Sequence, residues 1–302
     1  MWLLTCAIGP AFPQDNDDRP VVYGLKFEGN QYLEDLRLRA SIRTTPSSAF
    51  ARHPLLRWLG LGQKRYFNER DLQEDLIRLL VLYRASGFFE ARIDTVVTRS
   101  DQSVDVEFLI EEGPPVRVVT VQTLGAGDVL SREDLSDMPL QLGDPFDRLL
   151  LLATADSIRA IVRNRGYPFA EVFSNFDEDR VARVADVQFD VDFGSVAYID
   201  SIDIQGPTTV DERVVRRMLS IREGDRFSES GLLESQIELY RIGVFDYVDV
   251  SLADSTYDSL DDSLVNIRAQ VSEGRLQRVR AGFGSERSTA FVHWPRGPSE
   301  IS

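Results

Sequence analysis

The fold of this chain can be worked out from one stretch of sequence, Val104-Asp105-Val106-Glu107-Phe108-Leu109-Ile110-Glu111-Glu112-Gly113. Apolar residues stand at every second position, at Val104, Val106, Phe108 and Ile110. This period of two predicts a β-strand that covers a core on one face and meets water on the other. The strand is expected to end just before Gly113.

The same pattern occurs twice more in the chain. Alternating apolar runs close at Phe193-Gly194-Ser195 and at Glu273-Gly274-Arg275, and the three glycines are 81 and 80 residues apart. A fixed period of this size indicates three copies of one small domain. A chain of equal modules favours binding along its length over a single enclosed active site.

A long helix is predicted before each pair of strands. Its start is marked by an aromatic residue followed by a capping residue, at Phe67-Asn68, Phe146-Asp147 and Phe227-Ser228. Its end is marked by a glycine followed by an aromatic residue, at Gly87-Phe88-Phe89, Gly166-Tyr167 and Gly243-Val244-Phe245. The third helix is expected to be about one turn shorter and to bury Leu233, Ile237 and Tyr240.

A further strand and a short helix open each copy. The strands end at Gly29, Gly125 and Gly206, and the short helices are expected near 33–43, 131–138 and 211–220. The unit is therefore β-α-α-β-β, with two helices on one face of a three-stranded mixed sheet, which is an α+β fold. The predicted boundaries are 21–114, 115–195 and 196–274, called modules 1, 2 and 3 below.

Module 1 carries an insertion at about 46–66. The insertion has no acidic residue, although the whole chain has a net charge of −15, and it contains Arg52, Arg57, Trp58, Lys64 and Arg65. Two interpretations stay open. The insertion is either a helical loop packed on its own module, or a surface that meets a partner or anionic lipid headgroups.

These features resemble the POTRA domains of the BamA/TamA-type outer-membrane assembly superfamily. The resemblance is carried by Phe27-Glu28-Gly29-Asn30, by the turns Gly143-Asp144-Pro145-Phe146 and Gly224-Asp225-Arg226-Phe227, by the helix-to-strand junction at 83–89, and by the Glu-Gly pairs at 112–113 and 273–274. It implies modules that stand in the periplasm ahead of a membrane β-barrel and guide unfolded outer-membrane proteins. Residues 275–284 are similar to the family's first barrel strand, but the rest of the tail, to 302, does not follow the family. The expectation is therefore a fragment, or a prematurely ended reading frame, whose barrel is missing. Residues 1–20 are expected to be the remains of a signal or leader segment.

Several functional classes are disfavoured by composition. The acidic balance argues against a nucleic-acid-binding protein. The two histidines, His53 and His293, have no evident nucleophile or carboxylate partner, and Cys6 is the single cysteine. We expect a protein that is not an enzyme and that uses no cofactor and no metal.

Binding is expected at the exposed edges of the sheets, where unpaired backbone groups can accept an added strand. The family resemblance points to the strands at about 90–99, 169–177 and 245–253 as these edges. The candidate peptide-binding residues are Arg92, Asp94, Val96, Glu171, Phe173, Tyr247 and Asp249. The alternative is that these edges are merely solvated, or blunted by their charges.

The function expected from the resemblance is a scaffold in the periplasm, at the outer membrane. It would bind unfolded outer-membrane proteins, accessory assembly lipoproteins, or both, and no nucleic acid. Two alternatives stay open. One is the POTRA part of a transporter dedicated to secretion, and the other is a structural adaptor that binds only folded envelope partners.

Overall fold

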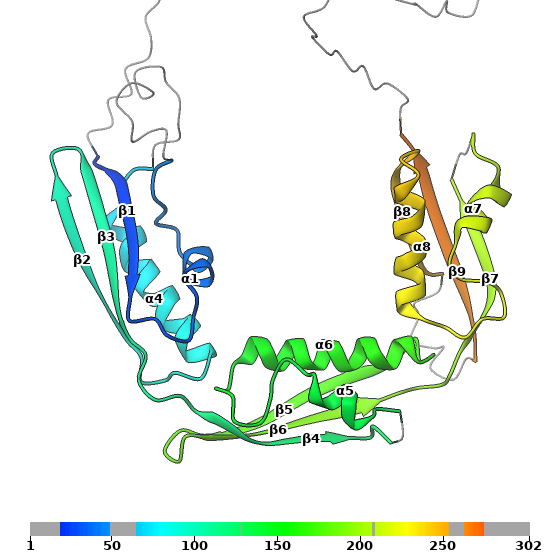
Figure 1. Cartoon of the computed structure of the whole chain (residues 1–302), viewed down its shortest axis with the longest axis horizontal. Coiled ribbons are helices and arrows are strands. Elements are labelled where there is room, and N and C mark those ends of the chain that lie inside the picture. Colours follow the sequence, from blue (N-terminus) through cyan, green and yellow to red (C-terminus); the bar gives the residue numbers. More distant parts are fainter. Residues whose placement is uncertain (1–18, 49–64, 128, 207–208, 254–262, 275–302) are drawn as a thin grey trace, which may run out of the picture.

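The computed structural model describes residues 19–48, 65–127, 129–206, 209–253 and 263–274. Within these residues, three separate three-stranded sheets follow one another along the chain. The three modules form an open arc, in which modules 1 and 3 rise from the two ends of module 2 (Figure 1). The long helix of each module faces the inside of this arc (Figure 1).

Module 1 contains, in chain order, β1 (Val21–Glu28), α1 (Asp35–Ser41), α4 (Glu69–Ala85), β2 (Arg92–Ser100) and β3 (Ser103–Glu111). Its strand order is β1-β3-β2, so the last strand lies in the centre of the sheet. β1 pairs with β3 in parallel, while β2 pairs with β3 antiparallel. The sheet is therefore mixed, as predicted.

Modules 2 and 3 repeat this arrangement. Module 2 contains β4 (Arg117–Leu124), α5 (Arg132–Ser136), α6 (Arg148–Asn164), β5 (Glu171–Asp179) and β6 (Val184–Asp192). Module 3 contains β7 (Tyr198–Gln205), α7 (Glu212–Met218), α8 (Glu229–Arg241), β8 (Phe245–Leu252) and β9 (Leu264–Glu273). The strand orders are β4-β6-β5 and β7-β9-β8, again with a parallel and an antiparallel pair in each sheet. The predicted α+β fold with three β-α-α-β-β units is confirmed.

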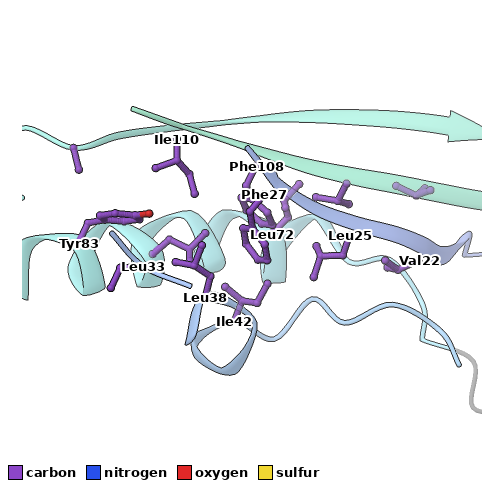
Figure 2. Packing of buried hydrophobic residues seen from close by; sticks show 14 of the residues in the cluster. Val22, Leu25, Phe27, Leu33, Leu38, Ile42, Leu72, Tyr83, Phe108 and Ile110 are labelled. Atoms are coloured by element: carbon purple, nitrogen blue, oxygen red, sulfur yellow. The ribbon is translucent and has the colours of Figure 1, made fainter. Parts of the chain in front are cut away.

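Each module has a hydrophobic core of its own, built between the helices and one face of the sheet. Figure 2 shows the core of module 1, where Phe27 of β1 and Phe108 of β3 lie close to Leu72 of α4. The two phenylalanine rings stack with their centroids 5.4 Å apart. Burial of a side chain of this size contributes roughly 1.5–3 kcal/mol, so a core of this kind holds each small module together.

The long helices begin at the predicted capping residues. The side chains of Asn68, Asp147 and Ser228 each accept a hydrogen bond from a backbone N–H of the first turn. α8 has 13 residues against 17 in α4 and α6, which confirms the predicted difference of about one turn.

The predicted buried face of α8 is wrong. Leu233, Ile237 and Tyr240 are 58%, 48% and 40% exposed, and the helix buries Leu232, Ser235 and Leu239 instead. The physical reason is a polar residue on the buried face. The Ser235 hydroxyl accepts the backbone N–H of Ser220 at 2.9 Å, so the buried face is not purely apolar.

The same buried hydrogen bond occurs in all three modules. Thr154 of α6 accepts the N–H of Leu140 at 2.9 Å. In α4, the two carboxylate oxygens of Asp75 accept the N–H groups of Arg43 and Thr44, both at 2.8 Å. Each bond ties the long helix to the segment that follows the short helix. Because all three side chains are fully buried, loss of the acceptor would leave a buried donor unpaired.

The Glu-Gly pairs also have a structural role. Glu112, just after β3, accepts the N–H groups of Gln31 and Tyr32 at 2.8 and 2.9 Å. Glu273, at the end of β9, accepts those of Thr209 and Val210. Each carboxylate therefore fixes the loop that follows the first strand of its module to the end of the central strand.

Neighbouring modules are joined by one backbone hydrogen bond that recurs. The N–H of Val116 donates to the carbonyl of Gly87 at 2.9 Å, and the N–H of Ala197 donates to that of Gly166 at 2.8 Å. In both cases the donor opens one module and the acceptor ends the long helix of the module before it.

Side chains reinforce both joints, by different pairs. Between modules 1 and 2, Arg37 contacts the fully buried carboxylate of Asp147 at 3.0 Å. Between modules 2 and 3, Arg163 contacts Glu229 at 3.3 Å. In addition, Phe89 packs on the core of module 2 and Phe169 on that of module 3. The arc is therefore held by packing and hydrogen bonds as well as by the covalent chain.

Candidate functional site

The strand that follows each glycine-aromatic junction lies at an edge of its sheet. These strands are β2, β5 and β8, and each pairs with one neighbour only among the described residues. The edge position is the one that the sequence predicts.

The opposite edges are covered by the chain itself. In module 1, Val22 of β1 donates its N–H to Arg65 and accepts the N–H of Ser47, both at 2.8 Å. Val118 of β4 and Ile199 of β7 make the corresponding pairs of bonds with the turns at 143–144 and 224–225. The segment before the long helix therefore occupies the outer side of β1, β4 and β7 at their first residues, while β2, β5 and β8 pair with no such segment in the described chain.

The candidate binding residues lie on the solvent faces of the three uncovered strands. Arg92, Asp94 and Val96 alternate along the exposed face of β2. Phe173 is 58% exposed on β5 and Tyr247 is 49% exposed on β8. The remaining candidates are partly exposed on the same strands, at Glu171 and Asp249. The structure does not bring the seven residues into one site, because they belong to three separate sheets.

The three edges differ in how far their backbone is already occupied. On β8, the N–H of Val248 donates to the hydroxyl of Tyr240, on α8, at 3.0 Å. On β5, the carbonyl of Val172 accepts a hydrogen bond from Arg159, on α6, at 3.4 Å. In both modules a side chain of the long helix therefore engages the outer side of the edge strand. Sequence reasoning missed these contacts because Tyr240 was assigned to the core.

The edge of β2 is the one that its long helix leaves free. No described side chain of α4 hydrogen-bonds to the backbone of β2, and the ion pair between Arg99 and Glu69 joins side chains only. The N–H of Thr95 points away from β3 and donates to the carboxylate of its neighbour Asp94 at 2.8 Å. Since outward-facing groups alternate along an antiparallel edge, Ile93 and Val97 also present their backbone N–H and C=O groups outward.

The basic insertion falls almost entirely outside the described residues. Arg52, Arg57, Trp58 and Lys64 lie there, so both interpretations of this segment stay predictions. Arg65 is described and its side chain is exposed. Its backbone joins the cover of β1, because its N–H donates to the hydroxyl of Ser47 at 3.0 Å.

The titratable groups of the module cores have structural partners. Burial, followed by the nearby Glu112 carboxylate, raises the pKa of the Tyr83 hydroxyl well above its ordinary value. The hydroxyl therefore stays protonated and donates to Glu112 at 3.2 Å. Among the described residues, no group of three or more His, Cys, Asp or Glu side chains could hold a metal ion. None of the described helices combines the length and the apolar character that a membrane span requires.

Three tandem units with two helices on a mixed β-β-β sheet define an array of POTRA domains. The family described as "POTRA: Surface antigen variable number repeat" matches residues 20–113 and 197–274, and the chain belongs to this family. Module 2 lies between the two matched stretches and has the same strand order.

Among curated proteins, the chain is similar to two outer membrane protein assembly factors named BamA. The protein from Neisseria meningitidis serogroup B is 24% identical over 228 residues, which cover 74% of this chain and 28% of the relative. The protein from Neorickettsia risticii is 23% identical over 268 residues, which cover 88% of this chain and 35% of the relative. The chain thus spans about a third of the length of these relatives.

Among solved structures, the chain is similar to POTRA domains 3–5 of BamA from Haemophilus influenzae. The TM-score is 0.53 and the sequence identity is 22%, with 84% of this chain and 96% of the other covered. A likeness at this identity shows the fold. The chain therefore has the fold of these POTRA domains.

Proposed function

We propose that this chain is a scaffold without enzymatic activity that acts in the assembly of outer-membrane proteins. It would stand in the periplasm, at the outer membrane, and bind unfolded outer-membrane proteins by adding their strands to its sheets. Accessory assembly lipoproteins are further proposed partners. Support comes from membership in the POTRA family and from relatives that are named outer membrane protein assembly factors.

The observation that carries the binding mode is the asymmetry of the three sheets. The first residues of one edge strand in each sheet pair with the chain's own loop, whereas β2, β5 and β8 pair with no such loop among the described residues. An extended peptide added to such an edge gains backbone hydrogen bonds that depend little on its sequence. This suits a scaffold that receives many different clients.

We further propose that β2 is the preferred edge. The outward backbone groups of β5 and β8 are partly engaged by Arg159 and Tyr240 of the long helices. On β2, those of Ile93 and Val97 meet no side chain of α4, and the N–H of Thr95 is bonded only to the neighbouring Asp94, which lies on the exposed face of the strand. A client strand would lie beside β2 with Arg92, Asp94 and Val96 on the solvent face next to it. Phe173 and Tyr247 would play the same part at the two less open edges.

The test uses the full chain and one pair of peptides. The first is a soluble peptide of alternating apolar and polar residues, as in a barrel strand, and the second is the same peptide with every backbone nitrogen methylated, so that neither edge of it can donate hydrogen bonds. Each backbone hydrogen bond lost is worth about 0.5–1.5 kcal/mol, so we expect the methylated peptide to bind at least about tenfold more weakly. Amide hydrogen exchange should slow at Ile93 and Val97 when the unmethylated peptide binds.

The variant Tyr240→Phe provides a matched positive control. It removes the acceptor of the Val248 N–H and leaves the rest of the side chain in place. We expect this variant to gain peptide-dependent protection along β8 without a change along β2. Equal binding of the two peptides, or protection confined to the helices, would refute strand addition. Binding of folded envelope proteins only would favour the adaptor alternative.

A further inference from the structure

Module 3 carries a hollow that is rimmed by arginines. The hollow has a volume of about 510 Å³ and lies between β7, α7 and the turn before α8. Its floor is formed by Ile202, Leu219 and Ile221, which are only 4–6% exposed. Its rim is formed by Arg213, Arg216, Arg217, Arg222 and Glu223. Four arginines around one hollow are unexpected in a chain with a net charge of −15.

One of the four arginines has a structural role. Arg216 contacts Glu212 and Glu223, both at 2.9 Å, and donates to the carbonyl of Ile202 at 3.0 Å. In module 1, Arg39 of α1 donates in the same way to the carbonyl of Leu25, at 2.8 Å. Arg216 therefore belongs to the shared design of the modules, because it ties the short helix to the first strand.

The other three arginines are different. Arg213, Arg217 and Arg222 are exposed, and within the described parts of the chain none of them has a carboxylate within ion-pair distance. With Arg39 and Arg216 aligned, the positions of Arg213 and Arg217 are held in α1 by Leu36 and Ala40. The repeated fold therefore does not require arginine there.

A guanidinium group binds carboxylates through a planar fork of N–H donors. Three such groups around a shallow floor of apolar residues can engage successive carboxylates of one extended segment. The hollow is also distinct from β8, since β7 and β8 are the two opposite edges of the sheet.

We propose that this arginine hollow is a docking site for an acidic linear segment of a partner polypeptide. The carboxylates of the segment would pair with Arg213, Arg217 and Arg222, and a small apolar side chain would face Ile202 and Ile221. The arginines favour an acidic occupant by charge complementarity. The rest of this chain is acidic and repels such a segment, so the attraction is confined to the hollow. The site is independent of client binding at β2.

The test measures binding of a fluorescent, glutamate-rich peptide with a single leucine to the full chain, by polarisation at physiological salt. The test variant replaces Arg213, Arg217 and Arg222 by Glu. The control variant replaces Arg70, Arg84 and Arg132 by Glu, which gives the same change of net charge at exposed arginines outside the hollow that also have no described ion pair. Far-UV circular dichroism checks that both variants are folded.

We expect saturable binding that is weakened at least tenfold in the test variant and less than twofold in the control variant. Binding of the peptide should shift the amide resonances of Ile202 and Ile221 and leave those of β2 unchanged. Equal weakening in both variants would mean unspecific attraction and would overturn the proposal. So would the absence of saturable binding, or binding to vesicles of anionic lipid without binding to the peptide.

Discussion

Alanine in place of Gly125 tests the turn that ends the first strand of module 2. Gly125 has φ of +75°, a conformation that costs an L-residue about 1–2 kcal/mol. In addition, a Cβ atom there would lie 2.4 Å from the carbonyl oxygen of Val191, in the central strand β6. A backbone atom in the middle of a sheet cannot move aside without disturbing the strand. The same close approach occurs at Gly29 and Gly206.

Gly143 provides a matched control within module 2. Its φ is +91° and a Cβ atom there would meet nothing within 4 Å. We expect Gly143→Ala to lower the free energy of unfolding by the conformational cost alone, about 1–2 kcal/mol. Gly125→Ala adds the cost of overpacking, about 1–3 kcal/mol. The two variants should therefore differ by about 1–3 kcal/mol.

The assay is amide hydrogen exchange of the full chain, read by mass spectrometry for each module. It is preferred to a single melting curve because a chain of three domains need not unfold in one step. We expect the slow amides of β6 to exchange about tenfold to hundredfold faster in Gly125→Ala than in Gly143→Ala, with β3 and β9 little changed. Equal exchange in the two variants would show that the close contact between a Cβ atom at residue 125 and the carbonyl oxygen of Val191 does not lower the stability of module 2, and would refute the reasoning.

Three further predictions concern the joints and the polar contacts inside the modules. Arg37→Ala leaves the buried carboxylate of Asp147 without its cation, so we expect a loss of about 1–3 kcal/mol and a wider distribution of distances between spin labels in modules 1 and 2. Asp75→Ala leaves two backbone N–H groups without an acceptor, so module 1 should lose about 2–4 kcal/mol, measured by urea dependence of its amide exchange. Hydrogen bonds, first that from the Thr209 hydroxyl, hold the pKa of Glu273 below its ordinary value of 4.5. The Glu273 carboxylate therefore stabilises module 3 fully above pH 4.5, and this contribution is lost as the pH falls through the lowered pKa. In Glu273→Gln the group no longer titrates, so the free energy of unfolding of module 3 should depend less on pH in the acid range.

Much of the fold could be predicted from the sequence because three copies report on one structure. The alternation at Val104–Ile110 and the capping residues Asn68, Asp147 and Ser228 are local signals, and the structure confirms what they indicate. The buried face of α8 could not be predicted from its apolar residues. Ser235 is buried there for its hydrogen bond, and a hydrophobic pattern does not show that.

The candidate sites were predicted less completely. The edge position of β2, β5 and β8 follows from the resemblance, but their unequal openness depends on contacts with the helix. Whether Tyr240 reaches the N–H of Val248 is decided by packing in three dimensions. The arginine hollow was also missed, since Arg213, Arg217 and Arg222 are spread over ten positions in the sequence. A comparison of the three copies could have revealed it, because α1 has Leu36 and Ala40 where α7 has two of these arginines.

Each joint combines a backbone hydrogen bond that both joints share with an ion pair that differs between them. The ion pairs therefore restrict the order in which the modules can follow one another. The backbone bond to Gly87 or Gly166 could connect any copy to any other, whereas the ion pairs could not. A duplicate of residues 115–195 inserted after the original would place Arg148 opposite Arg163, where Glu229 now stands. The two arginines would repel each other, so the new joint between the two copies of module 2 should be less rigid. Replacement of Arg148 by an acidic residue in the second copy should restore the ion pair. The order of the domains thus depends on a few charged residues at the joints, and these are the residues to change first when longer arrays are engineered.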